Sequence, residues 1–292
     1  MLPRLLSAVF LSFLSLLLPC ASAQQEVHSF ADSSAATAFR EVTFENAAAL
    51  FKQDQQSLAH SLQQQDPAWV SRQTPTQLSR YVEDRVLELY KDRGYWRAKV
   101  SAQVTWVRGA GLQRQVDVVI TAENEGEQYS LKEMHWNGVT AFPQSELQRM
   151  IGIRPFDLMS RSKLMAGLES IRRLYLAHGY IAYSAEPQTD FDDAAHNVVL
   201  AINVREDSAF RFGTLSVDGL DIDGSRKLQQ AWGQIHSQLY SPEKLRSFFE
   251  KFLPGVPANA DPLDYSHSSI DLDTHTVDIF ISVLPAQAEK SN

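Results

Sequence analysis

The chain has 292 residues, and its 35 Asp and Glu side chains outnumber its 27 Lys and Arg side chains, which gives a net charge of −8. A surface of this sign repels the phosphates of nucleic acids and of anionic lipids, so we expect neither to be a main partner. The length allows two or three domains of ordinary size.

The first 23 residues have the three parts of a secretory signal. Arg4 supplies a positive charge, Leu5 to Leu18 form an apolar run, and Ala21-Ser22-Ala23 is a cleavage site of small residues. A membrane anchor is the alternative, but the run is shorter than the roughly 20 residues that a spanning helix needs. We therefore predict export to the periplasm, with an association with the outer membrane that is only indirect.

The only cysteine, Cys20, lies inside this predicted signal. A lipoprotein would carry lipid on such a cysteine, but that modification needs a small residue just before it, and Pro19 occupies that place. After cleavage the chain would have no cysteine, and an exported protein without disulfides is typical of a bacterial periplasm. Chemistry through a thiol or a thiolate-bound metal is then excluded.

Three segments of the chain repeat one pattern, with apolar residues at the first, fourth and sixth places and Asn or Gly at the last. They are residues 39–46, 131–138 and 212–219. Such repetition indicates an array of small domains rather than one large catalytic fold. We predict a flexible segment at 24–38, units at 39–125, 126–206 and 207–284, and a polar tail at 285–292.

The first unit begins with a strand at 42–44, and a polar, Gln-rich helix at about 46–64 follows. Thr74-Pro75 is typical of the beginning of a second helix, because Thr caps free amides and Pro fits the first turn. That helix ends in Tyr90-Lys-Asp-Arg-Gly-Tyr95, where Gly94 is the expected cap. The other predicted elements are a loop around Pro67 and Pro75 and strands at 99–107 and 115–122, which form a hairpin around Gly109 and Gly111.

The second unit repeats this plan. Its first strand, at 129–138, ends in the turn Asn137-Gly138, and Ser160 is the expected N-cap of its longer helix. Tyr175-Leu-Ala-His-Gly-Tyr180 matches the end of the corresponding helix in the first unit, and Gly179 is the expected cap. The other predicted elements are a short helix from 142 to near 152, a strand at 180–189, a turn at 190–193 and a strand at 197–204.

The third unit departs from this plan at one place, because Pro254-Gly-Val-Pro-Ala-Asn259 replaces the Gly-Tyr pair. Its predicted elements are a strand at 212–217, a helix at 224–237, a helix that begins at Ser241-Pro242, and strands at 264–272 and 275–283. Each unit therefore has the order β-α-α-β-β. Trp69, Trp96, Trp106, Trp136 and Trp232 are expected in the cores or between units.

This pattern resembles the POTRA (polypeptide-transport-associated) domain, a β-α-α-β-β module that occurs in tandem in outer-membrane assembly and secretion families. The residues that carry the resemblance are the opening strand with its Asn or Gly turn, the helix that ends in Tyr-x-x-x-Gly-Tyr, and the closing hairpin. The hairpin leads through an acidic link to an aromatic residue, Tyr129 or Phe210. The resemblance covers about 39–284 and implies an α+β fold: a tandem array of three modules, each a three-stranded mixed sheet with two helices on one face.

In the insertase families such repeats precede a membrane β-barrel, and no series of alternating strands of barrel type follows the third unit here. The resemblance therefore implies only a periplasmic, non-enzymatic protein that binds or scaffolds polypeptides in outer-membrane protein assembly or transport. The partners that it implies are outer-membrane proteins or a barrel-bearing assembly complex. Two alternatives stay open: a split or truncated part of a barrel-bearing assembly factor, and an envelope enzyme or ligand-binding protein.

The candidate binding site is an edge of each sheet. If the last strand of a unit is central, the strand before it is an edge whose unpaired N–H and C=O groups can accept an extended peptide. Topology and the resemblance place these edges at 97–106, 180–189 and 264–271. The candidate binding residues are Arg97, Lys99, Ser101, Ala182, Ser184, Glu186, Tyr265 and His267.

No catalytic or metal-binding pattern is found. The eight histidines are scattered without metal-ligand spacing, and the sequence has no phosphate loop, nucleophile elbow or dinucleotide fingerprint. The segment 218–224 is rich in Asp but does not follow the order of an EF-hand loop, and Asp271-Leu-Asp-Thr-His275 is typical of a hairpin turn. We expect no catalytic residue, no metal and no cofactor.

Overall fold

A computed structural model describes residues 37–108, 114–253 and 266–282. The predicted signal with Cys20, the segment before residue 37, the turn at Gly109 and Gly111, the segment 254–259 and the tail at 285–292 lie outside these residues. Among the helices that are described, none is both long and apolar enough to cross a membrane.

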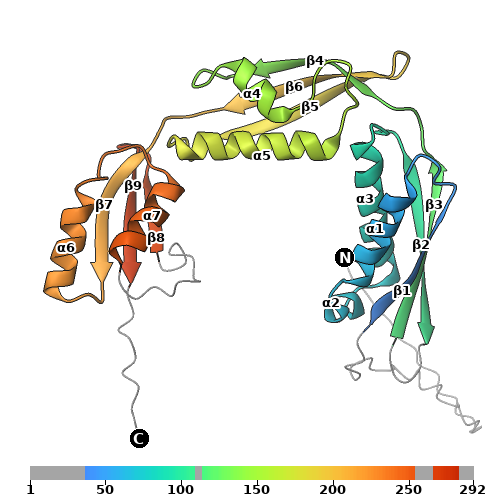
Figure 1. Cartoon of the computed structure of the whole chain (residues 1–292), viewed down its shortest axis with the longest axis horizontal. Coiled ribbons are helices and arrows are strands. Elements are labelled where there is room, and N and C mark those ends of the chain that lie inside the picture. Colours follow the sequence, from blue (N-terminus) through green and yellow to red (C-terminus); the bar gives the residue numbers. More distant parts are fainter. Residues whose placement is uncertain (1–36, 109–113, 254–265, 283–292) are drawn as a thin grey trace, which may run out of the picture. The chain divides into compact units, whose positions relative to one another are not determined.

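The described residues form three modules, and Figure 1 shows each sheet with its helices on one face. Module 1 contains β1 (Ala38–Glu45), α1 (Lys52–Gln63), α2 (Pro67–Ser71), α3 (Pro75–Asp92), β2 (Lys99–Arg108) and β3 (Arg114–Asn124). Module 2 contains β4 (Ser130–Asn137), α4 (Gln144–Ile151), α5 (Arg161–Ala177), β5 (Ser184–Asp192) and β6 (Asn197–Arg205). Module 3 contains β7 (Arg211–Asp218), α6 (Ile222–Trp232), α7 (Pro242–Phe252), β8 (Ser266–Asp271) and β9 (Thr276–Ser282).

All three sheets have the same strand order, with the last strand of the module in the centre. The orders are β1-β3-β2, β4-β6-β5 and β7-β9-β8. In each sheet the central strand runs parallel to the first strand and antiparallel to its hairpin partner. The sheets are therefore mixed, and the predicted α+β fold with a central last strand is confirmed.

Each core lies between the sheet and the helices, because the central strands alternate between buried and partly exposed residues. In β6, Val198, Leu200 and Ile202 are fully buried, whereas the residues between them lie on the face without helices. Trp136 and Trp232 are buried in the cores of modules 2 and 3, as the sequence predicted. Burial of these apolar side chains is the main source of stability for each module.

Helices α3, α5 and α7 begin at the capping residues that the sequence predicted, whereas the helix predicted at 224–237 spans Ile222–Trp232. Thr74 forms a capping box with Gln77 at the start of α3, and the side chains of Ser160 and Ser241 accept hydrogen bonds from amides at the starts of α5 and α7. Asp221 caps α6 by accepting a bond from the amide of Gly224 at 2.6 Å. The Asp-rich segment 218–224 thus begins a helix.

Two predictions for module 1 were wrong. The first helix begins at Lys52 and not near 46, because Asn46 has a left-handed backbone with φ of 56° and interrupts helical hydrogen bonding. The expected loop around Pro67 contains the short helix α2, in which Asp66 caps the amide of Ala68 at 2.9 Å and Pro67 fills the first turn.

The predicted strand at 180–189 is shifted along the chain. After Gly179 the chain forms a tight turn, in which the amide of Tyr180 donates to the carbonyl of Tyr175 at 3.0 Å, so β5 begins only at Ser184. The strand then continues through the expected turn at 190–193 and ends at Asp192, whose carboxylate accepts hydrogen bonds from the two amides of the turn that follows.

A tyrosine and a glutamate connect distant parts of modules 1 and 2. The Tyr90 hydroxyl donates to Glu125 at 2.8 Å, and the Tyr175 hydroxyl donates to Glu206 at 2.6 Å. Each glutamate directly follows its central strand and also accepts an amide bond from the loop after the first strand, at Ala49 in module 1 and Ala141 in module 2. These bonds join the long helix, the central strand and that loop.

Candidate functional site

The hairpin strands β2, β5 and β8 lie at sheet edges. The opposite edges of modules 2 and 3 are partly covered by the loops between their helices. The amide of Leu131 in β4 donates to the carbonyl of Asp157 at 2.9 Å, and the amide of Phe212 in β7 donates to the carbonyl of Gln238 at 2.9 Å. Because a strand edge binds another strand through unpaired backbone groups, the hairpin edges are the better candidates.

The structure places the candidate residues on three separate sheets and does not bring them together. Lys99 and Ser101 lie in β2, Ser184 and Glu186 in β5, and His267 in β8, whereas Arg97 and Ala182 lie in the turns before β2 and β5, and Tyr265 lies outside the described residues. The placement of Arg97 and Ala182 on edge strands was therefore wrong. The candidate edge at 97–106 included two residues before β2, which begins at Lys99 as the predicted strand did, and β5 begins four residues later than predicted.

The side chains of Ser101, Glu186 and His267 lie on the face without helices. Each of them pairs with a central-strand residue that lies between two buried residues and therefore points to the open face. The partner of His267 is Phe280. Phe280 is a large apolar side chain with 43 % of its surface exposed. A shallow hollow of about 230 Å³ lies beside it, lined also by His267 and Ser216.

The backbone of the edge in module 1 is not uniformly open. In an antiparallel pair, alternate residues direct their N–H and C=O groups toward the neighbouring strand and away from it. The amide of Ala102 in β2 points away, since it donates to the carboxylate of Glu83 in α3 at 2.9 Å. The prediction that this edge is unpaired along its whole length was therefore wrong at Ala102.

Arg97 makes structural contacts close to the start of β2. Its guanidinium lies 3.4 Å from the carboxylate of Asp193 and 4.8 Å from the centre of the Phe191 ring. The Tyr129 hydroxyl donates to the same carboxylate at 2.6 Å, and this bond together with the charge of Arg97 lowers the pKa of Asp193. Arg97 is therefore engaged with the β5–β6 hairpin.

The glycines of the two Gly-Tyr pairs have a second role beyond the predicted capping. Gly94 and Gly179 have φ of 87° and 89°, which confirms them as caps. Their carbonyls also accept hydrogen bonds from the amides of Tyr129 and Phe210, which directly precede β4 and β7, at 2.9 and 2.8 Å. A Cβ atom on Gly179 would lie 2.6 Å from the carbonyl oxygen of Phe210. Glycine therefore permits both the turn and this close approach.

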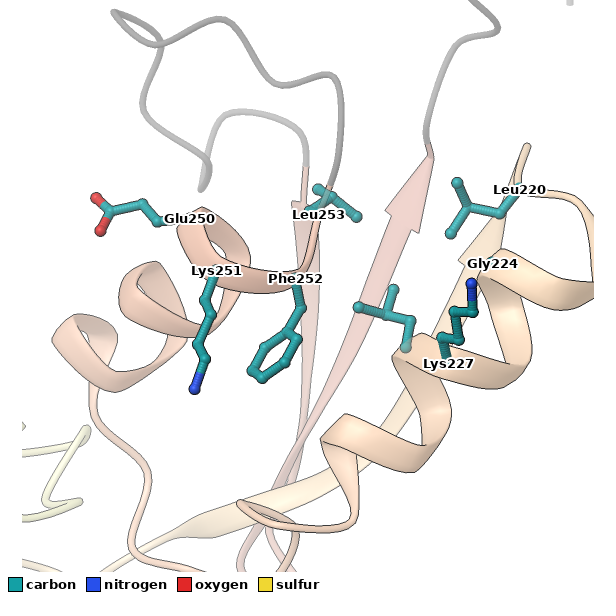
Figure 2. Close-up of a pocket in the computed structure, with 8 residues that line it drawn as sticks. Leu220, Gly224, Lys227, Glu250, Lys251, Phe252 and Leu253 are labelled. Atoms are coloured by element: carbon teal, nitrogen blue, oxygen red, sulfur yellow. The ribbon is translucent and has the colours of Figure 1, made fainter.

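A pocket of about 380 Å³ in module 3 lies between the beginning of α6 and the end of α7 (Figure 2). Its lining is mainly apolar, with Leu220 on one side and Phe252 on the other, and it also includes Lys227 and Glu250. Leu253, which also lines it, is the last residue described before 254–265. The pocket contains no arrangement of a nucleophile, a base and an acid.

Within residues 37–108, 114–253 and 266–282, no group of three or more His, Cys, Asp or Glu side chains could hold a metal ion. The cluster at 271–275 is a hairpin turn, as predicted, in which the carboxylate of Asp271 accepts bonds from the amides of Asp273 and Thr274 at 2.9 and 3.0 Å.

The described residues thus form three modules with the same strand order, in which module 1 has the short helix α2 in addition to two longer helices, and known proteins contain modules of this fold. Residues 129–207 match the family model POTRA, which is described as a surface antigen variable number repeat. POTRA domains 3–5 of BamA from Haemophilus influenzae match with a TM-score of 0.56 and 17% identity, over 85% of this chain and 96% of that chain. Residues 129–207, which include module 2, therefore match the POTRA family, and the described residues have the fold of three consecutive POTRA domains.

Two further matches to solved structures are weaker. POTRA domains 1–3 of the periplasmic domain of Omp85 from Anabaena match with a TM-score of 0.31 and 11% identity, over 87% of this chain and 96% of that chain. BamA from Haemophilus ducreyi lacking POTRA domains 1–3 matches with a TM-score of 0.39 and 16% identity, over 58% of this chain and 29% of that chain.

Proposed function

We propose that this chain is an exported, periplasmic POTRA-repeat protein that binds extended polypeptides during outer-membrane protein assembly or transport. The POTRA match of module 2 supports this class of function. The single observation that carries the mode of binding is the strand order, which leaves the hairpin strand of every module at a sheet edge. Backbone bonding at such an edge needs no particular side chain, so it suits a protein that handles many unfolded precursors.

The partners that we propose are outer-membrane proteins in an extended state, or an assembly complex that contains a barrel protein. The strands of such barrels alternate between apolar and polar residues, and before insertion they are unpaired. A temporary added strand would satisfy their backbone groups and prevent them from pairing with one another. Binding by strand addition requires no catalysis, and we propose none.

The test is a binding titration with the full chain. The probe is a fluorescent peptide of about ten residues with alternating apolar and polar side chains, copied from a strand of an outer-membrane barrel. The control is the same peptide with alternate amides methylated, which keeps the side chains but cannot form a hydrogen-bonded ladder. Fluorescence anisotropy should show saturable binding of the first peptide and a large loss for the second. Equal binding of both, or binding of neither, would refute strand addition.

A further inference from the structure

The outward-pointing amides of the hairpin strands differ between the modules. Ala102 of β2 lies opposite Ile120, and Pro187 of β5 lies opposite Ile202. The sequence spacing from Gly94 to Ala102 is the same as the spacing from Gly179 to Pro187. The two positions therefore correspond. Since the amide of Ala102 points away from its sheet, an amide at position 187 would point to the edge as well.

Both modules remove this edge donor, but by different means. In module 1 the amide of Ala102 is already bonded to Glu83, so an incoming strand would have to displace a carboxylate. In module 2 the corresponding residue is Pro187, which has no amide hydrogen to offer. Proline occurs in strands at edges where its nitrogen faces away from the ladder, which agrees with this orientation. The centre of each edge therefore lacks an available donor.

The edge of module 3 is different. Ser268 and Ile270 of β8 lie opposite the buried Ile279 and Val277, as Ala102 lies opposite the buried Ile120. Their backbone N–H and C=O groups therefore point outward, as the amide of Ala102 does. Neither is a proline, and in the described part of the chain no helix side chain accepts a hydrogen bond from either amide. Most of β8 is exposed, and 52 % of the Ile270 surface is open to solvent.

We propose that an extended polypeptide adds to β8 of module 3 in preference to β2 and β5. The inference rests on the proposed function and names the module that performs it. The occupant is an extended segment, because a row of outward N–H and C=O groups fits the backbone of another strand. Apolar surface is exposed on both faces near this edge, at Ile270 toward the helices and at Phe280 on the open face, and this favours a segment with apolar residues.

The first experiment measures binding of the fluorescent barrel-strand peptide to the full chain carrying Ser268→Pro. The matched control is Ser268→Ala, which changes the side chain and keeps the amide. We expect Ser268→Pro to weaken binding about tenfold or more, since an outward donor is lost and the added ring obstructs the edge, and Ser268→Ala to bind as the unmodified chain does. Unchanged binding by Ser268→Pro would overturn the assignment to module 3.

Two more variants test the blocked edges. Pro187→Ala restores the donor in module 2, and Glu83→Ala frees the amide of Ala102, whereas Glu83→Gln keeps an acceptor oxygen and serves as the control. We expect the first two to raise the number of peptides bound per chain from about one toward two, and Glu83→Gln to leave it unchanged. No added binding by either Pro187→Ala or Glu83→Ala would contradict the role given to these residues.

Hydrogen exchange of the unmodified chain separates the possible failures and does not depend on the folding of any variant. Peptide binding should slow the exchange of amides in β8, while β2 and β5 stay unchanged. Protection of β2 or β5 instead would overturn the choice of module and leave strand addition intact. Absence of peptide binding to the unmodified chain would refute the proposed function itself.

Discussion

The hydrogen-bond network around Glu206 gives the sharpest test of what holds module 2 together. One carboxylate oxygen accepts bonds from the Tyr175 hydroxyl at 2.6 Å and from the amides of Thr140 and Ala141 at 2.9 and 3.0 Å. The other oxygen accepts the Thr140 hydroxyl. Only 8 % of the Glu206 surface is exposed, so these donors have few alternatives. Glu206→Ala removes the shared acceptor of the helix, the central strand and the loop.

The expected loss can be worked from the donors that are left without a partner. Water can reach the exposed Thr140, but the Tyr175 hydroxyl and the Ala141 amide are at least partly buried. Each buried donor left unsatisfied costs about 1–3 kcal/mol, so Glu206→Ala should destabilise module 2 by about 3–4 kcal/mol. Tyr175→Phe removes one bond and keeps the carboxylate on its amides, so it should cost only about 1 kcal/mol.

Hydrogen exchange followed by mass spectrometry measures this loss in the full chain. In Glu206→Ala the amides of β6 should exchange roughly several hundredfold faster, while those of β9 in module 3 keep their rates. Glu186→Ala in β5 is the control, because it removes a carboxylate that is exposed. If β6 exchanged as slowly in Glu206→Ala as in the control, the network would not contribute to stability and the reasoning would be refuted.

Three other predictions concern pH and three glycines. Burial alone would raise the pKa of Glu206, but its hydrogen bonds outweigh burial and lower it. The stabilisation is therefore present above the unfolded pKa of 4.5 and is lost as pH falls through the lower folded pKa. Between about pH 6 and about pH 3, the free energy of unfolding measured in urea should vary less for Glu206→Gln than for the unmodified chain. Gly167→Ala should lower the free energy of unfolding by about 1–3 kcal/mol, and with it the urea midpoint, because the added Cβ would overlap the Cα atom of Ile151, although alanine usually stabilises a helix. A higher midpoint would contradict this. Gly179→Ala should cost more than Gly152→Ala, since both positions have left-handed backbones but the added Cβ at Gly152 meets nothing within 4 Å; equal shifts of the urea midpoint would contradict this.

Local features of the sequence predicted most of the fold. Thr74, Ser160 and Ser241 marked helix starts because capping depends on residues that are neighbours in sequence. The central strands were recognisable from alternating apolar residues, whereas the strand order was predicted from topology and the family resemblance. The errors arose at Asn46 and at Tyr180, where the chain turns sharply before a regular element begins. Such turns depend on contacts with other elements, which local patterns do not describe.

The contacts between distant residues could not be read in the same way. Glu125 and Glu206 were interpreted only as parts of acidic links, although each immediately follows the last strand of its unit and accompanies a Tyr-x-x-x-Gly-Tyr ending. Their joint recurrence is a clue to the pairing, but only the fold shows that the two residues meet. The capping of Ala102 by Glu83 has no such clue, because module 2 blocks the same position with Pro187.

The blocked edges also have a consequence for solubility. An open strand edge can pair with the same edge of a second molecule, and proteins avoid this with proline, charge or a covering helix. Glu83 and Pro187 follow this rule in modules 1 and 2. A chain with both Glu83→Ala and Pro187→Ala would expose two more complete edges, so it should associate in a concentration-dependent way. Sedimentation velocity over a hundredfold range of concentration would detect this. A double variant that sediments as Glu83→Gln does would show that these residues do not protect the edges.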